Sequence, residues 1–290
     1  MVDEIHAILA LGGEGTFTHQ AAYRFAELYN TNPKNIALKK SNEEVILQTI
    51  KDYKSFGVVP FETTGSGLVP EVIDTLIKNL DRNPKICGSH IMPIEQCFAY
   101  KGELSKIKTV LSKPEAIKQC QTYLDQLSVS NPGIKKEYAD STSQAAAKAS
   151  EDETVAAICS KLAAELNGLH CVSGIQDSKN NETRFIMISD NDCVTPTGID
   201  DRTLLFYEVE NKPAALDNAI SAFGRRSLNK TIQTSIATRI SLGRYAMLTE
   251  VQAHRSDTRM QRALREVEEE WAIPGSLYVF GSYPVYGSGK

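Results

Sequence analysis

Apolar residues recur along the chain with two different periods, and these periods predict where strands and helices form. Short apolar runs over 5–11, 56–60 and 109–112 end in glycine, proline or polar residues, which is typical of buried strands. Other segments gather apolar residues on one helical face. The clearest is 69–80, whose apolar face is formed by Val72, Ile73, Leu76, Ile77 and Leu80. Strands and helices alternate in this way from residue 5 to about residue 190, which predicts an α/β fold with largely parallel sheets.

The order of elements changes after a stretch rich in Asn, Asp, Thr, Pro and Gly at 190–201, which we interpret as a linker. The segments that follow are a strand at 202–209, a helix at 213–223, strands at 231–239 and 245–251, a charged helix at 257–271 and a strand at 277–283. This β-α-β-β-α-β order is typical of a ferredoxin-like domain. We therefore expect two domains, at 1–194 and 200–286, divided at about residue 195.

Composition and charge narrow the class of protein. The 290 residues are 41% hydrophobic and carry a formal net charge of −4, so no general electrostatic attraction for nucleic acid is expected. No apolar run approaches the ~20 residues of a membrane span, and the first residues are acidic where a signal peptide is basic. We expect a cytoplasmic protein that binds neither nucleic acid nor membrane. The six cysteines lack CxxC spacing and the five histidines are scattered, so we expect buried free thiols and no metal site.

Glycine, hydroxyl and charged residues cluster in four segments at the boundaries between predicted elements. These segments are 12–18, 60–69, 140–146 and 177–185. A glycine-rich turn before a helix, as in 12–18, lets backbone N–H groups approach an anion. In the last segment Arg184 is suited to a bidentate contact with a carboxylate, and the Thr183 hydroxyl to donating a hydrogen bond or a proton. Each segment taken alone is equally consistent with helix capping or a surface ion pair.

Taken together and in this order, the segments make the chain resemble the prephenate dehydratase family over nearly its whole length. The matching motifs are Gly13-Glu14-Gly15-Thr16-Phe17, Val59-Pro60 with Glu62 and Gly67, Pro114-Glu115-Ala116 with Gln119-Cys120, Ser141-Thr142 with Ala145-Ala146, Ala156-Ala157-Ile158, and Asn181-Glu182-Thr183-Arg184-Phe185. The family's most diagnostic signature is its Thr-Arg-Phe triplet, which is intact at 183–185.

The resemblance implies a two-lobed, periplasmic-binding-protein-like α/β catalytic domain, with the active site between the lobes, followed by a ferredoxin-like ACT domain. It implies that Thr183 and Arg184 are catalytic, with Thr183 assisting the loss of the 4-hydroxyl of prephenate and Arg184 holding a substrate carboxylate. Glu62 is a third candidate, either as a general acid/base or as a helix cap. The substrate-binding residues it implies are Gly15, Thr16, Thr63, Thr64, Ser141, Thr142, Asn181 and Phe185. The reaction implied uses no cofactor and no metal, and relatives of this kind form homo-oligomers through the ACT domain.

The chain departs from the family's motifs in both predicted domains. The usual Glu-Asn-Ser-x-x-Gly is Glu62-Thr63-Thr64-Gly65-Ser66-Gly67, and the usual Ser-His-Pro is Ser112-Lys113-Pro114, where we interpret Lys113 as a solvated charge. In the ACT region the usual Gly-Ala-Leu is Ala214-Ala215-Leu216, and the usual Glu-Ser-Arg-Pro is Ala237-Thr238-Arg239-Ile240. The added methyl group and the lost carboxylate predict that phenylalanine sensing is weakened or absent.

These observations leave three functions open. The leading hypothesis is a non-aromatising prephenate decarboxylase of secondary metabolism, which protonates the ring and keeps the 4-hydroxyl, because the loop at 62–67 and the predicted sensor are both altered. The alternative is a prephenate dehydratase, which expels the hydroxyl and forms phenylpyruvate, and the intact triplet at 183–185 favours it. The third is a non-catalytic binding or sensor protein, because solute-binding proteins share the two-lobed fold.

Overall fold

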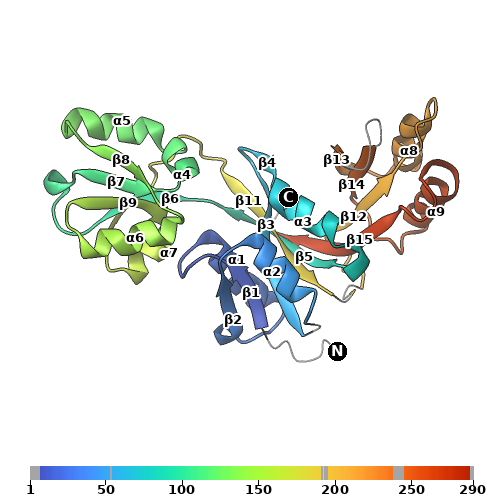
Figure 1. The fold of residues 1–290 in the computed structure, drawn as a ribbon, viewed down its shortest axis with the longest axis horizontal. Helices are drawn as coiled ribbons and strands as arrows, with labels where there is room; N and C mark the ends of the chain where they lie inside the picture. Colours follow the sequence, from blue (N-terminus) through green and yellow to red (C-terminus); the bar gives the residue numbers. More distant parts are fainter. Residues whose placement is uncertain (1–6, 53, 191, 193–194, 238–244, 288–290) are drawn as a thin grey trace.

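The computed structural model describes residues 7–52, 54–190, 192, 195–237 and 245–287. Figure 1 shows three parts along the longest axis: a central lobe, a second lobe joined to it by two extended crossings, and a C-terminal unit on the other side. The central lobe contains β1 to β5 and β11, the second lobe β6 to β10, and the C-terminal unit β12 to β15. The predicted α/β class with two lobes is confirmed.

The central lobe contains two strands on predicted apolar runs, β1 and β3, and β2, which the sequence did not predict. β1 (Ala7–Leu11) pairs in parallel with β2 (Ile36–Lys39) and with β3 (Ser55–Thr63). β11 (Glu182–Ser189) lies antiparallel between β3 and β5 (Lys85–Pro93). The strands that continue into the crossings are antiparallel because one crossing leaves the lobe after β5 and the other returns before β11. This is where the expectation of largely parallel sheets does not hold.

Different helices cover the two faces of the central sheet. α1 (Phe17–Leu28) packs on the face that carries Phe185, and α2 (Asn42–Thr49) and α3 (Pro70–Lys78) pack on the face that carries Ile186. Successive strand residues point to opposite faces, so β11 supplies side chains to both apolar cores.

The second lobe has a five-stranded sheet in the order β10-β6-β9-β7-β8. Its strands are β6 (Gln96–Tyr100), β7 (Thr109–Ser112), β8 (Lys135–Tyr138), β9 (Val155–Ser160) and β10 (His170–Val172). Its helices are α4 (Pro114–Lys118), α5 (Gln121–Ser130), α6 (Thr142–Glu151) and α7 (Lys161–Leu166). The helix predicted over 114–127 is therefore two helices, separated at Gln119 and Cys120.

The C-terminal unit has the predicted β-α-β-β-α-β order. Its elements are β12 (Asp201–Glu208), α8 (Ala215–Gly224), β13 (Lys230–Ala237), β14 (Tyr245–Val251), α9 (Thr258–Glu266), a wider helical turn at Val267–Trp271, and β15 (Tyr278–Tyr286). Thr238, Arg239 and Ile240, which we singled out in the sequence, lie outside the described residues.

The C-terminal unit continues the sheet of the central lobe. β15 pairs in parallel with β5 through Val285 and Tyr286, so the described strands of both parts form one ten-stranded sheet. In Figure 1 the arrow of β15 accordingly runs beside β5 of the central lobe. One apolar core also spans the junction and includes Leu248 and Phe280 from the unit and Ile186 from the lobe. The two parts are therefore joined by backbone pairing and by shared side-chain packing.

Four of the six cysteines, Cys97, Cys120, Cys159 and Cys171, are free thiols as expected. Cys87 is disulfide-bonded, which corrects the expectation of free thiols throughout. Among the described residues, no helix combines the length and apolar character needed to cross a membrane. The same part of the chain holds no group of three or more His, Cys, Asp or Glu side chains placed to bind a metal ion.

Candidate active site

Thr183 lies on the α1 side of the sheet, at the start of β11 where the chain returns from the second lobe. It is directly opposite Thr63 of β3 and Met92 of β5, so three side chains form one row across the sheet. Thr183 is 8% exposed, and Phe185, two residues further along the same face, is 2% exposed in the core beneath α1. Thr183 thus lies at the edge of this core, near the first residue of β11.

Arg184 points to the opposite face of β11. Its Nη1 donates to both carboxylate oxygens of Glu250 in β14 at 2.8 Å, and its Nη2 lies 3.1 Å from the carboxylate of Glu62. The guanidinium also lies over the ring of Phe61, 4.9 Å from its centroid, and Arg184 is only 4% exposed. Its partners in this structure are thus the carboxylates of Glu250 and Glu62, and its side chain lies on the face opposite that of Thr183 because successive strand residues alternate.

The charges of this pair are mutually stabilised. Burial alone raises the pKa of Glu250, but Arg184 and hydrogen bonds from Thr231 and Tyr283 outweigh it, so the pKa lies below its ordinary value. Burial likewise opposes the charge of Arg184, but Glu250, Tyr283 and Glu62 together raise its pKa above the ordinary value. Both groups are charged at neutral pH.

Gly15 joins the two lobes across the cleft. Its N–H donates to Nδ1 of His19 in α1 at 3.0 Å, and its carbonyl accepts a hydrogen bond from Oγ of Ser160 in the second lobe at 2.5 Å. Its φ is +81°, and a Cβ added there would lie 2.7 Å from Cα of Ala163. Only glycine therefore allows the loop to approach α7 this closely.

Thr16 and His19 hold the glycine loop from the α1 side. Oγ1 of Thr16 accepts the backbone N–H of His19 at 3.3 Å as the N-cap of α1 and donates to the carbonyl of Gly13 at 2.9 Å. Burial lowers the pKa of His19, and the nearby charge of Glu14 only partly opposes this. The ring is therefore neutral at pH 7, and its Nδ1 is available as the acceptor for Gly15.

The first turn of α6 faces the glycine loop from the second lobe. Oγ of Ser141 accepts the N–H of Gln144 at 3.0 Å and lies 3.1 Å from Oγ of Ser143, and a Cβ on Gly13 would lie 2.8 Å from that Ser143 oxygen. Thr142, in the same turn, is 9% exposed. Because helix N-termini and glycine-rich loops both favour anions, this meeting point is suited to a substrate carboxylate.

Thr63 and Thr64 brace the turn between β3 and β4 (Gly67–Leu68). Oγ1 of Thr63 lies 2.7 Å from Oγ of Ser66 and accepts a hydrogen bond from the backbone N–H of Ser66 at 3.2 Å. Oγ1 of Thr64 donates to the carbonyl of Glu182 at 3.0 Å and accepts its N–H at 2.9 Å, which fastens the turn to the start of β11. The hydroxyls that replace the family's Asn-Ser pair thus hold the loop beside Thr183.

Buried amides connect the two crossings between the lobes. The N–H of Ile94 donates to the carbonyl of Asn181 at 2.8 Å, and the N–H of Gln96 donates to Oε1 of Gln176 at 2.8 Å. Nε2 of Gln96 donates to Oε1 of Gln119 at 3.2 Å. Nδ2 of Asn181 and Oε1 of Gln96 are buried without a hydrogen-bond partner among the described residues. Unpaired buried groups are costly, so both are candidates for contacting a ligand.

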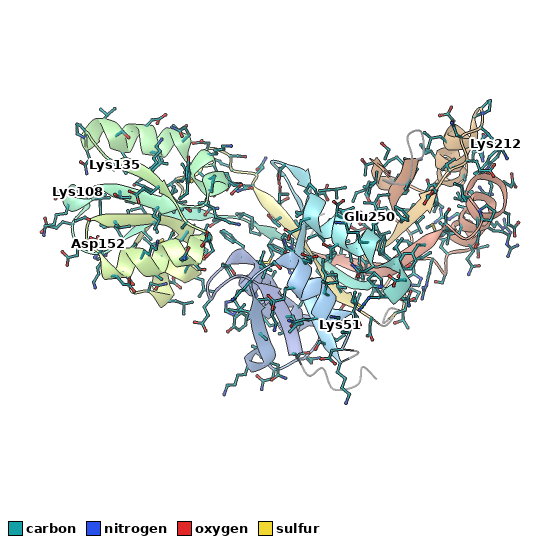
Figure 2. All side chains as sticks on the ribbon, in the orientation of Figure 1. Lys51, Lys108, Lys135, Asp152, Lys212 and Glu250 are labelled. Atoms are coloured by element: carbon teal, nitrogen blue, oxygen red, sulfur yellow. The ribbon has the colours of Figure 1, made fainter. Side chains whose placement is uncertain are left out.

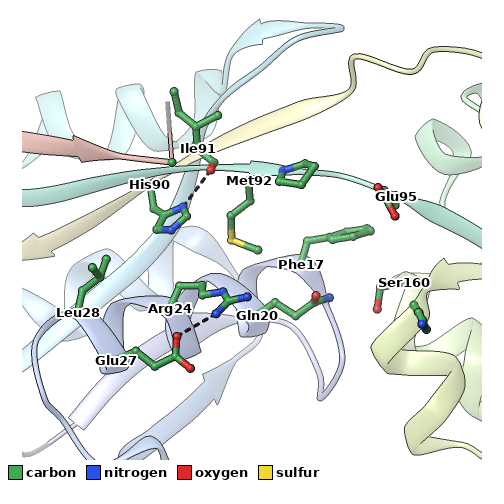
Figure 3. Close-up of a pocket in the computed structure, with 13 residues that line it drawn as sticks. Phe17, Gln20, Arg24, Glu27, Leu28, His90, Ile91, Met92, Glu95 and Ser160 are labelled. Atoms are coloured by element: carbon green, nitrogen blue, oxygen red, sulfur yellow. Dashed lines mark hydrogen bonds and ion pairs between the residues drawn. The ribbon is translucent and has the colours of Figure 1, made fainter. Parts of the chain in front are cut away.

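A cavity of about 730 Å³ lies between α1, β5 and the start of α7, beside the row that contains Thr183 (Figure 3). It is lined by Phe17, Gln20, Arg24, Glu27, Leu28, His90, Ile91, Met92, Pro93, Glu95, Ser160, Lys161 and Gly287. Met92 links the two features, since it lines the cavity and pairs directly with Thr183. The volume lies in the range of small-molecule sites.

The structure distributes the predicted site residues over three places. The first place is where the glycine loop meets the second lobe, and it contains Gly15, Thr16, Ser141 and Thr142. The second is the start of β11, with Thr63, Thr64, Asn181 and Thr183. The third is the ion pair of Glu62 with Arg184, whose side chain lies on the face opposite that of Thr183. Phe185 is a core residue. Ser160, His19 and Gln96 were not predicted as site residues from the sequence. The one signal for Ser160 is its place between a strand and a helix, where α/β proteins bind ligands.

These features define a two-lobed α/β protein with a polar site between the lobes, and comparison with known proteins identifies its family. A sequence profile of the prephenate dehydratase family matches residues 8–193. The chain is 30% identical over 278 residues to a bifunctional chorismate mutase/prephenate dehydratase from Aquifex aeolicus, covering 94% of this chain and 72% of that one. The chain therefore belongs to the prephenate dehydratase family, as its motifs suggested.

Solved structures agree on the fold. A prephenate dehydratase from Arthrobacter aurescens, in complex with L-Phe, matches with a TM-score of 0.80 and 26% identity, covering 96% of this chain and 89% of that one. GqqA, described as a novel type of quorum quenching acylase, matches with a TM-score of 0.81 and 24% identity, covering 97% and 98%. Since the activity described for GqqA differs from that of the dehydratases, the fold alone does not define the reaction.

Proposed function

We propose that the chain is a prephenate dehydratase, which converts prephenate to phenylpyruvate, carbon dioxide and water. The observation that carries this proposal is the match to the prephenate dehydratase family over residues 8–193, a range that includes Thr183. The non-aromatising decarboxylase, our leading hypothesis from the sequence, has less support, because the relatives described above that carry a prephenate activity are named for dehydration.

In the proposed reaction the ring carboxylate leaves as carbon dioxide, and its electron pair moves through the ring diene to expel the 4-hydroxyl. The hydroxyl takes up one proton and leaves as water, and the ring becomes aromatic. Thr183 is the donor to the departing oxygen, which lowers the barrier by general acid assistance. The glycine loop and the first turn of α6 bind a carboxylate, and Arg184 pairs with the carboxylates of Glu250 and Glu62.

Incubation with prephenate tests the proposal directly. We expect phenylpyruvate, identified by absorbance and mass spectrometry before any acid treatment, because prephenate aromatises in acid without an enzyme. A product that has lost carbon dioxide but kept the 4-hydroxyl would instead establish the decarboxylase. Unchanged prephenate would leave a binding or sensor protein as the surviving hypothesis.

We further propose that the C-terminal unit is an ACT domain through which the chain self-associates, because its β-α-β-β-α-β order matches that of such domains. Light scattering is expected to give at least twice the mass of one chain. We predict that L-phenylalanine does not bind tightly, since Ala214 and Ala237 replace the glycine and the carboxylate of the family's sensor motifs. Isothermal titration calorimetry with L-phenylalanine should give no saturable heat, and tight binding would contradict the prediction.

A further inference from the structure

The buried carboxylate of Glu250 connects four other strands through side-chain hydrogen bonds. Within the C-terminal unit it accepts from Thr231 of β13 at 2.5 Å, from Tyr283 of β15 at 2.6 Å and from Nη1 of Arg202 of β12 at 3.2 Å. From the central lobe it accepts from Arg184 of β11 at 2.8 Å. Figure 2 shows Glu250 where the central lobe meets the C-terminal unit.

This cluster leaves Glu250 and Arg184 little freedom to move. Glu250 is 0% exposed and Arg184 is 4% exposed, so water cannot replace either partner. The two arginines that contact Glu250 each have a second carboxylate partner. Arg202 donates to Asp200 at 2.8 Å, and Arg184 pairs with Glu62 at 3.1 Å. A substitution that removes the charge of Glu250 would leave the buried Arg184 with only the half-exposed Glu62 as its counterion.

Arg184 directly follows Thr183 on β11. The contacts of its guanidinium with Glu250 and Glu62 therefore also restrain the backbone that carries the Thr183 hydroxyl. We infer that Glu250 is a positioning residue for Thr183: the C-terminal unit holds Glu250, Glu250 holds Arg184, and Arg184 sets the place of the hydroxyl beside the cleft. This inference rests on the proposed function, in which Thr183 assists the loss of the 4-hydroxyl. It gives the C-terminal unit an effect on turnover that requires no bound effector.

The test compares two variants at the cluster with one matched control. Glu250→Gln removes the charge and keeps the shape, and Tyr283→Phe keeps the charge and removes one hydrogen bond to it. The control is Glu266→Gln in α9, a carboxylate of the same unit that pairs with Arg225 and Arg226, away from β11. Circular dichroism and thermal melting establish which variants are folded. Tyr283→Phe decides the question if Glu250→Gln does not fold.

Two readouts separate positioning from a purely structural role. Steady-state kinetics follow the loss of prephenate, so that they do not depend on which product forms, and hydrogen exchange with mass spectrometry follows the backbone amides of β11. We expect Glu250→Gln to lower kcat by about 5–150-fold with little change in KM, and Tyr283→Phe to lower it less. Exchange at the amides of Thr183 and Arg184 should rise in both variants and stay at the wild-type rate in Glu266→Gln.

Unchanged β11 exchange in the folded variants overturns the inference, whatever happens to turnover. Faster exchange with unchanged kcat overturns it too, because the contact would then matter to the structure only. If the wild-type protein does not consume prephenate, the proposed function fails, and the exchange experiment alone decides whether Glu250 fixes the position of Thr183.

Discussion

Thr183 presents one hydroxyl at the edge of the core, and the proposed mechanism depends on it. Thr183→Ala removes the donor to the departing oxygen, so we predict that kcat falls by about 10²–10⁴-fold, the usual contribution of a positioned general acid. Thr183→Ser keeps the hydroxyl and is expected to retain much of the activity. The measurement is the initial rate of phenylpyruvate formation.

A matched control for this substitution is Thr122→Ala, which removes an exposed hydroxyl from the first turn of α5. It should leave kcat unchanged. Wild-type turnover in Thr183→Ala would show that the hydroxyl has no part in the chemistry.

Gly15 offers a second test at the scale of one residue. Gly15→Ala places a methyl group 2.7 Å from the Cα of Ala163, so the glycine loop and α7 must separate. Because a misplacement of about 1 Å can cost 10²-fold in rate, we predict a loss of about that size in kcat/KM for prephenate.

Gly133 provides the control for the strain that any side chain meets at positive φ. It has φ of +99°, and a Cβ there meets nothing within 4 Å. Gly133→Ala should therefore cost about 1–2 kcal/mol in the free energy of unfolding and leave kcat/KM unchanged. Equal kinetic losses in Gly133→Ala and Gly15→Ala would contradict the role of the close contact.

The motifs name candidate site residues, but they do not show in which direction each side chain points. The sequence placed Thr183 and Arg184 together in one motif, and the alternation of strand residues separates them onto opposite faces. The partner of Arg184 could not be predicted at all, because Glu250 lies 66 residues away within an ordinary alternating strand. The sequence around a polar residue on such a strand does not show whether that residue will pair with a buried cation.

Among the elements, α8 begins in an unusual way. Its N-cap, Ala214, has φ of +62°, a left-handed conformation that costs residues other than glycine about 1–2 kcal/mol. Ala214→Gly relieves this strain but increases the entropy of the unfolded chain, which offsets about 0.4–1 kcal/mol. We predict that the variant is more stable by about 0.5–1 kcal/mol, measured by urea unfolding.

The opposite result is expected at an ordinary helical alanine. Ala147 is exposed within α6, and Ala147→Gly should lower the free energy of unfolding by about 1 kcal/mol. If both substitutions destabilised the protein equally, the strain assigned to Ala214 would be wrong.

Elements with a strong apolar period were predictable, and those without one were not. The face formed by Val72, Ile73 and Leu76 is buried in α3 as its spacing predicts. β8 was missed because all four of its residues, Lys135 to Tyr138, are exposed at the edge of the sheet and show no apolar pattern. Backbone pairing with β7 forms this strand, and a single sequence carries little trace of that pairing.

In the whole molecule, the junction between the central lobe and the C-terminal unit is the feature least accessible from sequence. The order of elements predicted a separate ferredoxin-like unit, whereas the pairing of β15 with β5 joins residues that are almost 200 positions apart. One face of the unit's sheet is covered by the central lobe, because Leu204, Phe206 and Leu248 on that face pack in the core that the two parts share. Long-range pairing of this kind depends on the assembled fold and not on local pattern.

The charged cluster within this junction predicts how the stability of the molecule depends on pH. The pKa of Glu250 is lowered below its ordinary value of 4.5 in the folded protein, so its contribution is fully present above pH 4.5 and is lost as the pH falls from there through the lowered value. Glu250→Gln should reduce the free energy of unfolding by about 3–5 kcal/mol at pH 7, because it leaves Arg184 without its buried partner. The difference between the two proteins should then shrink as the pH falls below 4.5, since protonation removes the same charge from the wild-type carboxylate. Urea unfolding between pH 7 and pH 3 measures this difference, and a constant gap across that range would show that the ion pair with Arg184 does not hold the lobe and the C-terminal unit together.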